Sequence, residues 1–345
     1  MRIAYIVPSL ANKGPVIVVK ELVDQMTSNG HECTVFYFDD IKQLSFACST
    51  KRLFQNDRIN FLEFDIIHSH GIRPDWFVYR YREYSGKVRY LSTVHNYVFQ
   101  DLSYQYNYFI AQVFGRFWMR WLRKHDKIVT LSMNAMKYYE QWINNDKLAY
   151  AYNTRSIDKT KKLSDNELKE LLNFKGKDIL IGVNALLSPR KGIDILIKAL
   201  PVLPEYRLFI VGDGKSRKGL EQLARIKGVY NRCYFAGVKA DAYRYLPYYD
   251  IFAMPSRSEG FPLALLEAAF YSKTSVVADI PIVKEAFTTE EVSMFQLSKP
   301  ETIVGAILKA TNNSDMGEKM YEKYTLCYSP ENMYRKYISI YQQEP

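Results

Sequence analysis

Two glutamates stand eight positions apart in the stretch SRSEGFPLALLEAAF, which covers residues 256–270. Glu259 is followed by Gly260, Phe261 and Pro262. Proline suits the first turn of a helix, because the N–H group that it lacks would be unpaired there. A helix that starts at Pro262 would direct its free backbone N–H groups and the positive end of its dipole toward a ligand. The pattern predicts an anion site at residues 260–264, suited to phosphate.

Glu267 lies inside the helix that follows, among Leu265, Leu266, Ala268 and Ala269. An ionised carboxylate in apolar surroundings is costly unless it gains partners. Two hydroxyls of a ligand, such as those of a ribose, would supply them. The alternative is an ordinary helix with a glutamate that faces solvent.

A basic turn follows the first apolar run of the second half, in the segment LLSPRKGIDILIKAL (186–200). Arg190 and Lys191 can together bind a diphosphate and stabilise it as a leaving group. The alternative is a solvated basic loop. The Gly-Asp-Gly turn at 212–214 lacks the third glycine of a dinucleotide fingerprint, so it is weak evidence for NAD.

Three histidines offer a second kind of chemistry. His68 and His70 share one face of a predicted strand, and His95 ends another, so the three could bind zinc. No carboxylate motif of a metalloenzyme accompanies them, and no Asp-x-Asp sequence occurs in the chain. We therefore expect no metal site, with zinc as the minor alternative.

Apolar runs that alternate with helix-length segments position these residues. The runs indicate strands of parallel sheets in both halves of the chain, with ligands at the carboxyl ends of the strands. The predicted strands lie at 2–7, 33–38, 64–70, 88–95, 127–132, 178–187, 206–214, 233–238, 250–255 and 275–280. The expected fold is α/β, with two Rossmann-like doubly wound domains facing each other across a cleft. Their predicted bounds are 1–153 and 178–328, with a linker at 154–177 and a C-terminal helix at 329–345 that packs back on the first domain.

Composition narrows the class of protein. The chain has 345 residues, 48% of them hydrophobic and 24% charged, as in globular proteins. Its formal net charge of +10 favours a polyanionic partner. Four scattered cysteines indicate neither a disulfide framework nor a zinc knuckle. No apolar run is long enough to cross a bilayer and no secretion signal is evident, so we expect a cytoplasmic protein.

The segment 108–127 is the best candidate for the surface through which the positive net charge acts. Apolar side chains recur in it at helical spacing, while Arg116, Arg120, Arg123 and Lys124 occupy an adjoining face. Such a helix could lie on an anionic membrane or meet a lipid-diphosphate acceptor. Alternatively, it buries its aromatic side chains in the core of the first domain.

Residues 178–287 resemble the donor domain of retaining GT-B glycosyltransferases of family 4, also called group 1. The resemblance rests on LLSPRKGIDILIKAL, YRLFIVGDGKSRKGLEQLA, VYNRCYFAGVKAD, YYDIFAMPSRSEGFPLALLEA and VVADIPIVKEAF. The family's Glu-x7-Glu signature falls on Glu259 and Glu267.

The resemblance implies a role for each matching position. Glu267 would bind the ribose, Glu259 the transferred sugar and Lys191 the diphosphate of a nucleotide sugar. Residues 235–239, which include Gly237 and Val238, would lie against the base. Backbone N–H groups would come from the turn formed by Gly260, Phe261, Pro262, Leu263 and Ala264.

The first half resembles the acceptor domain of the family more loosely. Gly14 falls in the turn after the first strand, and His95 lies where the family often has a histidine near the transferred sugar. One position departs from the family pattern. Ala185 stands where an arginine usually makes a second diphosphate contact, and Arg190 is a hypothetical replacement.

The resemblance implies a metal-independent, retaining hexosyltransferase-type glycosyltransferase without a cofactor. Its donor would be a UDP- or GDP-sugar, and its acceptor a bacterial surface glycan of the lipopolysaccharide or capsule type, on a lipid carrier. The enzyme would work in the cytoplasm at the inner face of the membrane. Alternatives are a nucleotide-sugar epimerase, a phosphorylase-like enzyme, or a basic protein that binds membranes or nucleic acid without catalysis. No RNA-binding motif is present, so nucleic acid is not an expected partner.

Overall fold

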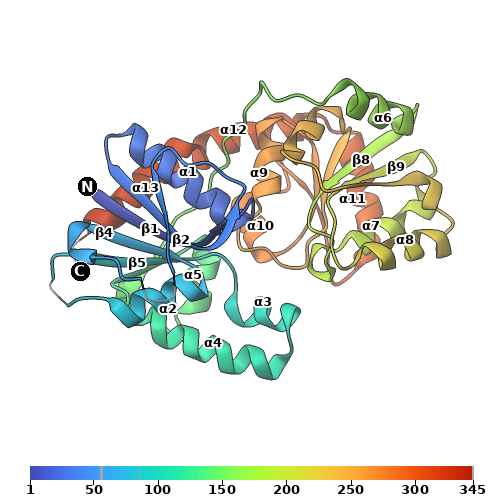
Figure 1. Cartoon of the computed structure of the whole chain (residues 1–345). Helices are drawn as coiled ribbons and strands as arrows, with labels where there is room; N and C mark the ends of the chain where they lie inside the picture. Colours follow the sequence, from blue (N-terminus) through green and yellow to red (C-terminus); the bar gives the residue numbers. More distant parts are fainter. Residues whose placement is uncertain (55–56, 85, 344–345) are drawn as a thin grey trace. The chain divides into compact units, whose positions relative to one another are not determined.

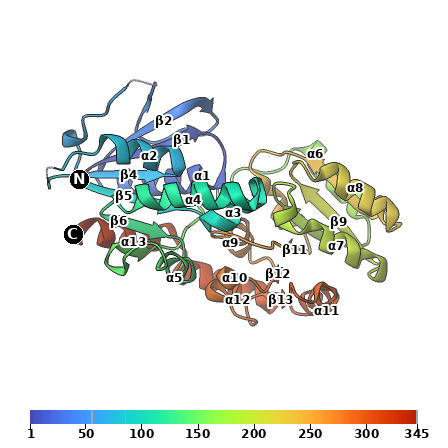
Figure 2. The same cartoon turned by 90° about the horizontal axis from the view of Figure 1, so that it is seen from below.

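The computed structural model describes residues 1–54, 57–84 and 86–343. The chain divides into unit 1, made of Met1–Ser156 and Tyr328–Pro345, and unit 2, Ile157–Cys327 (Figure 1). Each unit has a parallel sheet flanked by helices (Figures 1 and 2). This confirms the predicted fold class of two doubly wound α/β domains.

The sheet of unit 1 has seven strands within the described residues, in the order β3-β2-β1-β4-β5-β6-β7. They are β1 (Arg2–Leu10), β2 (Glu32–Lys42), β3 (Ser49–Arg52), β4 (Ile66–His70), β5 (Arg89–Val94), β6 (Lys127–Thr130) and β7 (Leu148–Tyr150). The helices are α1 (Gly14–Ser28), α2 (Ile72–Tyr81), α3 (Val98–Gln105), α4 (Tyr108–Leu122), α5 (Met133–Tyr139) and α13 (Pro330–Gln342), with a 3-10 turn η1 (Phe61–Glu63).

Helix α1 forms despite its β-branched run Val16–Val19, which disfavours a helix in isolation. Val19 and Val23 pack into the core beside β1, and Val16 and Val18 are also buried, so tertiary burial outweighs local propensity. The helix begins at Gly14, with Lys13 at the N-cap position.

The C-terminal helix α13 belongs to unit 1. Met333, Tyr337, Ile340 and Tyr341 of α13 are buried in the same cluster as Tyr5 of β1. The chain therefore closes the core of unit 1 with residues more than 300 positions away in sequence.

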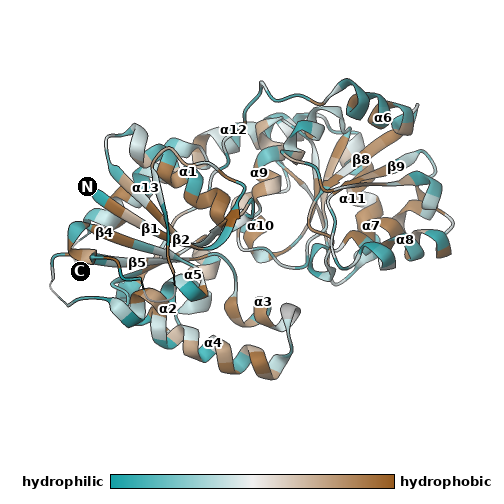
Figure 3. Cartoon of the chain, viewed as in Figure 1, coloured by the Kyte–Doolittle hydropathy of each residue, from teal (hydrophilic) through white to brown (hydrophobic). Residues whose placement is uncertain are grey.

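The sheet of unit 2 has six strands among the described residues, in the order β10-β9-β8-β11-β12-β13. They are β8 (Ile179–Asn184), β9 (Tyr206–Val211), β10 (Cys233–Gly237), β11 (Ile251–Met254), β12 (Ser275–Ala278) and β13 (Ser293–Phe295). The helices are α6 (Asp165–Lys175), α7 (Ile193–Ala199), α8 (Arg217–Ile226), α9 (Leu263–Phe270), α10 (Pro281–Ala286), α11 (Ile303–Thr311) and α12 (Asp315–Cys327). The remaining 3-10 turns are η2 (Asn145–Lys147) in unit 1 and η3 (Pro189–Lys191), η4 (Leu200–Val202), η5 (Tyr230–Arg232), η6 (Ala242–Tyr248) and η7 (Pro300–Thr302) in unit 2. Strands of both sheets are strongly hydrophobic (Figure 3), as expected where helices cover a parallel sheet.

The segment 154–177, expected to be a linker, contains the helix α6 of unit 2. Ser164 and Glu167 form a capping box at its start: the Ser164 side chain accepts from the Glu167 N–H, and the Glu167 carboxylate accepts from the Ser164 N–H. The lysine-rich composition of this segment suggested a linker, whereas the capping box in its first turn specifies a helix.

None of the described helices is long and apolar enough to span a bilayer.

Candidate active site

Strand order in unit 2 changes direction between β8 and β11, which lie next to each other in the sheet. Crossovers lead away from this point on both sides, and in open α/β sheets ligands bind beside the loops that follow two such strands. The loop after β8 carries Arg190 and Lys191, and the loop after β11 carries Glu259. Sheet topology therefore brings together three predicted site residues that lie up to 69 positions apart.

Glu259 is the centre of this charged cluster. Its side chain is 7% exposed. Lys191 Nζ lies 2.6 Å from Glu259 Oε1, and Arg190 Nη1 lies 3.2 Å from Glu259 Oε2. Arg190 also donates to the carbonyl of Ser258 at 2.8 Å.

Two opposing effects act on the pKa of Glu259. Burial raises this pKa. The adjacent Lys191 and Arg190 charges lower it by more than burial raises it, so the pKa lies below its usual range. The carboxylate is therefore ionised at neutral pH. One anion and two cations leave the cluster with a net positive charge, which suits an anionic ligand.

The loops that carry the cluster are fastened to each other. Arg257 binds both carboxylate oxygens of Asp194 at 2.9 Å, and its backbone N–H donates to the carbonyl of Arg190 at 2.7 Å. Gly192 has φ of 67°, and a side chain there would meet the carbonyl of Pro255. Only glycine permits this close approach, so the loops are held in one arrangement.

Helix α9 starts one residue later than expected. Leu263 is its first residue, and Pro262 occupies the N-cap position. The N–H group of Leu263 donates to the carbonyl of Phe261 within the turn, so this predicted anion-binding donor is already engaged. Phe261 and Pro262 are buried, while Gly260 and Ala264 are partly exposed.

Glu267 is partly buried on α9, between the buried residues Leu266 and Ala268. Burial, together with the nearby charges that include Glu267, raises the pKa of Tyr271. The Glu267 carboxylate is therefore close enough to Tyr271, four residues further along the chain, for its charge to act on that hydroxyl.

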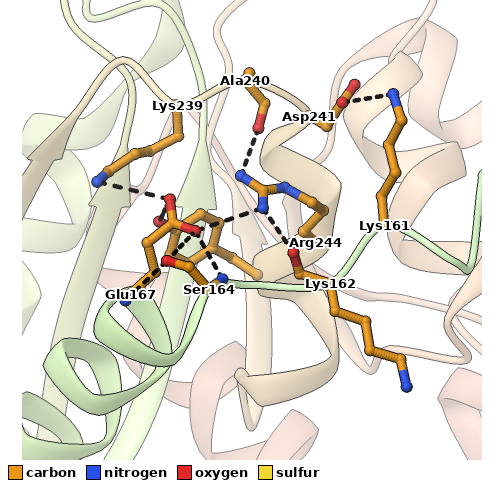
Figure 4. Close-up of polar contacts among 9 residues, drawn as sticks. Lys161, Lys162, Ser164, Glu167, Lys239, Ala240, Asp241 and Arg244 are labelled. Carbon is orange, nitrogen blue, oxygen red and sulfur yellow. Dashed lines mark hydrogen bonds and ion pairs between the residues drawn. The ribbon is translucent and has the colours of Figure 1, made fainter.

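Gly237 is the last residue of β10, and Val238 and Lys239 begin the loop that follows it. Gly237 accepts a hydrogen bond from the N–H of Gly212 at 2.8 Å, which joins this loop to the loop after β9. Val238 is exposed. Lys239 Nζ lies 3.8 Å from a carboxylate oxygen of Glu167 (Figure 4).

Glu167 anchors the start of unit 2, a role that we did not predict. It accepts from Tyr245 at 3.0 Å and from Arg244 at 3.4 Å, and Arg244 also donates to the carbonyl of Lys162 (Figure 4). The capping-box pattern at 164–167 was the signal in the sequence. This cluster connects the first segment of unit 2 to the loop after β10.

A second set of predicted residues lies in unit 1, where strand order changes direction between β1 and β4. Gly14 begins the helix after β1, His70 ends β4, and His95 follows β5. His70 Nδ1 lies 2.9 Å from His95 Nε2. Sheet topology thus places His95, a predicted site residue, next to His70, which the sequence suggested only as a zinc ligand.

The three-histidine zinc hypothesis is wrong for the arrangement observed. Both ring nitrogens of His68 are engaged, Nδ1 with the Tyr341 hydroxyl at 2.7 Å and Nε2 with the Thr93 hydroxyl at 2.8 Å. The described residues contain no group of three side chains placed to bind a metal ion. Tyr341 comes from α13, and its distance in sequence is why this contact was not foreseen.

Comparison with known proteins agrees with this architecture. Residues 164–325 match the model of Glycosyl transferases group 1, and residues 13–159 match that of Glycosyltransferase Family 4. The O-antigen biosynthesis glycosyltransferase WclY of Escherichia coli is 32% identical over 350 residues, which cover 99% of this chain and 98% of that protein.

Two solved structures illustrate the fold. HepE of Anabaena, in complex with UDP and glucose, has a TM-score of 0.82 at 16% identity and covers 99% of both chains. WaaG, a glycosyltransferase involved in lipopolysaccharide biosynthesis, has a TM-score of 0.71 at 15% identity and covers 99% of this chain and all of that one. The solved structures show that the fold is GT-B. Together with the two family models and the full-length relative, they show that the chain belongs to the glycosyltransferases of family 4, also described as group 1.

Proposed function

We propose that this glycosyltransferase moves a sugar from a UDP- or GDP-sugar to a lipid-linked bacterial surface glycan of the O-antigen type, with retention of anomeric configuration. Three findings support the proposal: family membership, the full-length relative named for O-antigen biosynthesis, and the UDP complexes of HepE, a protein of the same fold. We place the reaction in the cytoplasm, at the inner face of the membrane.

The observation that carries the proposal is the cluster of Lys191, Arg190 and Glu259 at the switch point of unit 2. Its net positive charge is held in place by a buried carboxylate, so it needs little reorganisation when a diphosphate arrives. Such fixed charges stabilise a leaving group better than mobile ones do. Arg190 lies beside Lys191 at the same carboxylate, and we assign it the second diphosphate contact that Ala185 cannot make.

In the proposed reaction, the bond between the sugar C1 and the diphosphate oxygen breaks, and its electron pair leaves with the diphosphate. The acceptor hydroxyl forms the new bond to C1 on the same face, and its proton passes to the departing oxygen. Lys191 and Arg190 offset the charge that develops on that oxygen. Glu259 positions the sugar, and neither glutamate acts as a nucleophile. We propose no cofactor and no metal ion in this step.

The remaining residues bind the ends of the donor. Glu267 accepts hydrogen bonds from the ribose, and Gly237 and Val238 lie against the base. Gly260 and Ala264 offer backbone N–H groups in the turn that holds Phe261, Pro262 and Leu263. In unit 1, Gly14 and His95 contact the transferred sugar.

Product analysis tests the function. The full chain is incubated with a panel of UDP- and GDP-sugars and a lipid-linked glycan acceptor, with and without a chelator. We expect one donor to raise the melting temperature, because it binds only the folded state, and to yield a glycosylated acceptor with the anomeric configuration of the donor. Donor consumption that gives an isomerised sugar or a sugar phosphate would instead indicate the epimerase or phosphorylase alternative.

A lipid-linked acceptor requires the enzyme to reach a membrane, and α4 provides a suitable surface. Figures 1 and 2 draw α4 at the outside of unit 1, next to α2. Its buried side comprises Ala111, Gly115, Trp118, Met119 and Leu122. A second apolar face is exposed: Phe109 by 76%, and Phe114 and Phe117 by 52% each. The buried side agrees with packing in the core of unit 1, and the exposed apolar side supports the membrane contact that we propose. Hydrophobic residues recur along the helix in Figure 3.

Charge complementarity favours an anionic bilayer as the occupant of the exposed face. Arg116, Arg120, Arg123 and Lys124 are exposed beside these phenylalanines, and no acidic residue occurs between Asp101 and Asp126. Aromatic side chains can enter the boundary between headgroups and acyl chains while the cations contact lipid phosphates.

Vesicle sedimentation tests this contact. Wild-type protein should bind phosphatidylglycerol vesicles more tightly than phosphatidylcholine vesicles. Changing Phe109, Phe114 and Phe117 to serine should weaken binding at least tenfold, whereas Ile226→Ser, an exposed apolar control on α8, should not. Arg116→Gln with Arg120→Gln should reduce binding only to the anionic vesicles. Equal binding by all four proteins would rule out α4 as the membrane surface.

A further inference from the structure

The pair formed by His70 and His95 raises the question of which ring carries the shared proton. The two facing nitrogens, His70 Nδ1 and His95 Nε2, are 2.9 Å apart. A neutral imidazole has one N–H donor and one acceptor nitrogen. Two neutral rings at this distance therefore place one proton between them, and the position of that proton decides what the outer nitrogen of each ring can do.

Both rings are neutral near pH 7. Burial lowers the pKa of His95 to about 3, and burial followed by the neighbouring histidines lowers the pKa of His70 well below its usual value. A low-dielectric environment disfavours the imidazolium form of either ring.

The far side of His70 distinguishes the two possible arrangements. His70 is 1% exposed, and its Nε2 atom is buried without a hydrogen-bond partner among the described residues. If His95 donated to His70, the proton of His70 would sit on this Nε2 atom as a buried, unpaired donor. If His70 donates instead, Nε2 is left with only a lone pair. Orphaned buried N–H groups are the rarer of the two in proteins.

We infer that His70 donates its Nδ1–H to Nε2 of His95, so that the partly exposed His95 keeps its own Nδ1–H as a hydrogen-bond donor for the substrate. The role toward substrate rests on the proposed function, in which the transferred sugar lies beside His95. His70 is then a positioning residue: it acts on the ligand only through the tautomer and orientation of His95.

This polarity limits the chemistry of His95. Its Nε2 lone pair is occupied by His70, and its outer nitrogen carries a proton, so the ring can donate to an oxygen of the sugar or acceptor. It cannot take the proton of the attacking hydroxyl as a general base. The proton must therefore leave by another route, consistent with transfer to the departing diphosphate oxygen.

Nitrogen NMR of the full chain, labelled with 15N in histidine, tests the assignment directly. The five histidines of the chain allow assignment by single substitutions such as His31→Gln. Long-range spectra distinguish a protonated ring nitrogen from an unprotonated one. We expect His95 to be protonated at Nδ1; protonation at Nε2 would overturn the inference.

Variants of His70 separate positioning from structure. His70→Asn keeps a side-chain N–H near the position of Nδ1, whereas His70→Phe removes it. We expect His95 to keep its tautomer in the asparagine variant and to populate the other one in the phenylalanine variant. Turnover should fall by about tenfold in His70→Phe and stay within about twofold of wild type in His70→Asn.

An unchanged His95 tautomer in a folded His70→Phe protein would show that His70 is structural only, which contradicts the proposal. The spectra need no donor or acceptor. If the wild-type protein transferred no sugar, the proposed function would fail while the hydrogen-bond assignment could still be judged.

Discussion

The points where strand order reverses in the two sheets have the same topology, but one is charged and the other is neutral. In unit 2, a buried carboxylate is held between Lys191 and Arg190. In unit 1, the corresponding edge is lined by neutral imidazoles and hydroxyls, with His70 next to His95 and His68 between Tyr341 and Thr93. One fold can therefore offer fixed charge for a diphosphate at one site and neutral hydrogen-bonding groups for sugar hydroxyls at another.

Histidine distribution makes this contrast measurable. All five histidines lie in unit 1, at positions 31, 68, 70, 95 and 125, and unit 2 has none. The two units should therefore respond to acid at different pH values.

The largest expected effect is loss of unit 1 stability in weak acid. Burial lowers the pKa of His95 to about 3, and it lowers the pKa of His68, His70 and His125 below 6.5. Below pH 6.5 the unfolded chain binds protons that the folded chain does not, so the free energy of unfolding falls as pH falls. Each histidine contributes up to about 1.4 kcal/mol per pH unit, and the four together up to about 5 kcal/mol per pH unit. Hydrogen exchange should show residues 1–156 losing protection near pH 5.5, while residues 157–327 keep theirs. Simultaneous loss in both ranges would contradict this difference.

Lys191→Ala should have the next largest effect. Removing a preorganised charge at the leaving group typically lowers turnover by about 10² to 10³. Steady-state kinetics with the active donor should show the loss mainly in kcat. Lys227→Ala, an exposed lysine just after α8, serves as the matched control and should leave turnover unchanged. If Lys191→Ala were as active as the control, Lys191 would not belong to the site.

Glu259→Gln tests whether the charged cluster also stabilises unit 2. Burial opposes ionisation of Glu259, but Lys191 and Arg190 lower its pKa overall. The carboxylate therefore contributes stability that is complete above about pH 4.5 and is lost as pH falls through the lower pKa of the folded state. The variant should lose about 1 to 3 kcal/mol at pH 7, measured by hydrogen exchange in residues 157–327. Glu205→Gln, at an exposed glutamate, should change stability by less than about 0.5 kcal/mol. A Glu259→Gln loss that did not shrink in acid would argue against an ionised carboxylate.

The smallest effect is expected from Glu267→Gln. Glutamine keeps the size of the side chain but weakens the acceptor offered to a ribose, so affinity for the nucleoside diphosphate should fall by about tenfold. Calorimetric titration measures this loss. His95→Gln should leave the same affinity unchanged, because we place His95 against the sugar. An equal loss in both variants would remove the distinction between the two ends of the donor.

Local patterns predicted most of the fold. Apolar runs located the central strands of both sheets, because strands buried on both faces need nearly continuous hydrophobic sequence. The short strands β3, β7 and β13 at the sheet edges were missed. The four residues of β3 are Ser-Thr-Lys-Arg, all exposed, and such a strand forms through pairing with β2 rather than through its own composition.

The candidate site was predictable to a similar extent. Residue types and resemblance singled out Glu259, Lys191, Arg190 and Glu267. They did not reveal that Glu259 binds both cations, nor that the Leu263 N–H group is engaged within its own turn. Interactions of this kind depend on how two loops approach each other, which spacing within either loop does not encode.

The sequence by itself determined the class of fold, the two repeats of strands and helices, and the family, because hydrophobic periodicity and short motifs are local properties. Only the tertiary structure decided which charges neutralise each other, which histidine faces which, and that Tyr341 closes a hydrogen-bond network begun at His68. Those outcomes follow from the order of strands in the sheets. That order brings together side chains far apart in the chain and buries them, and burial makes their pairing energetically necessary.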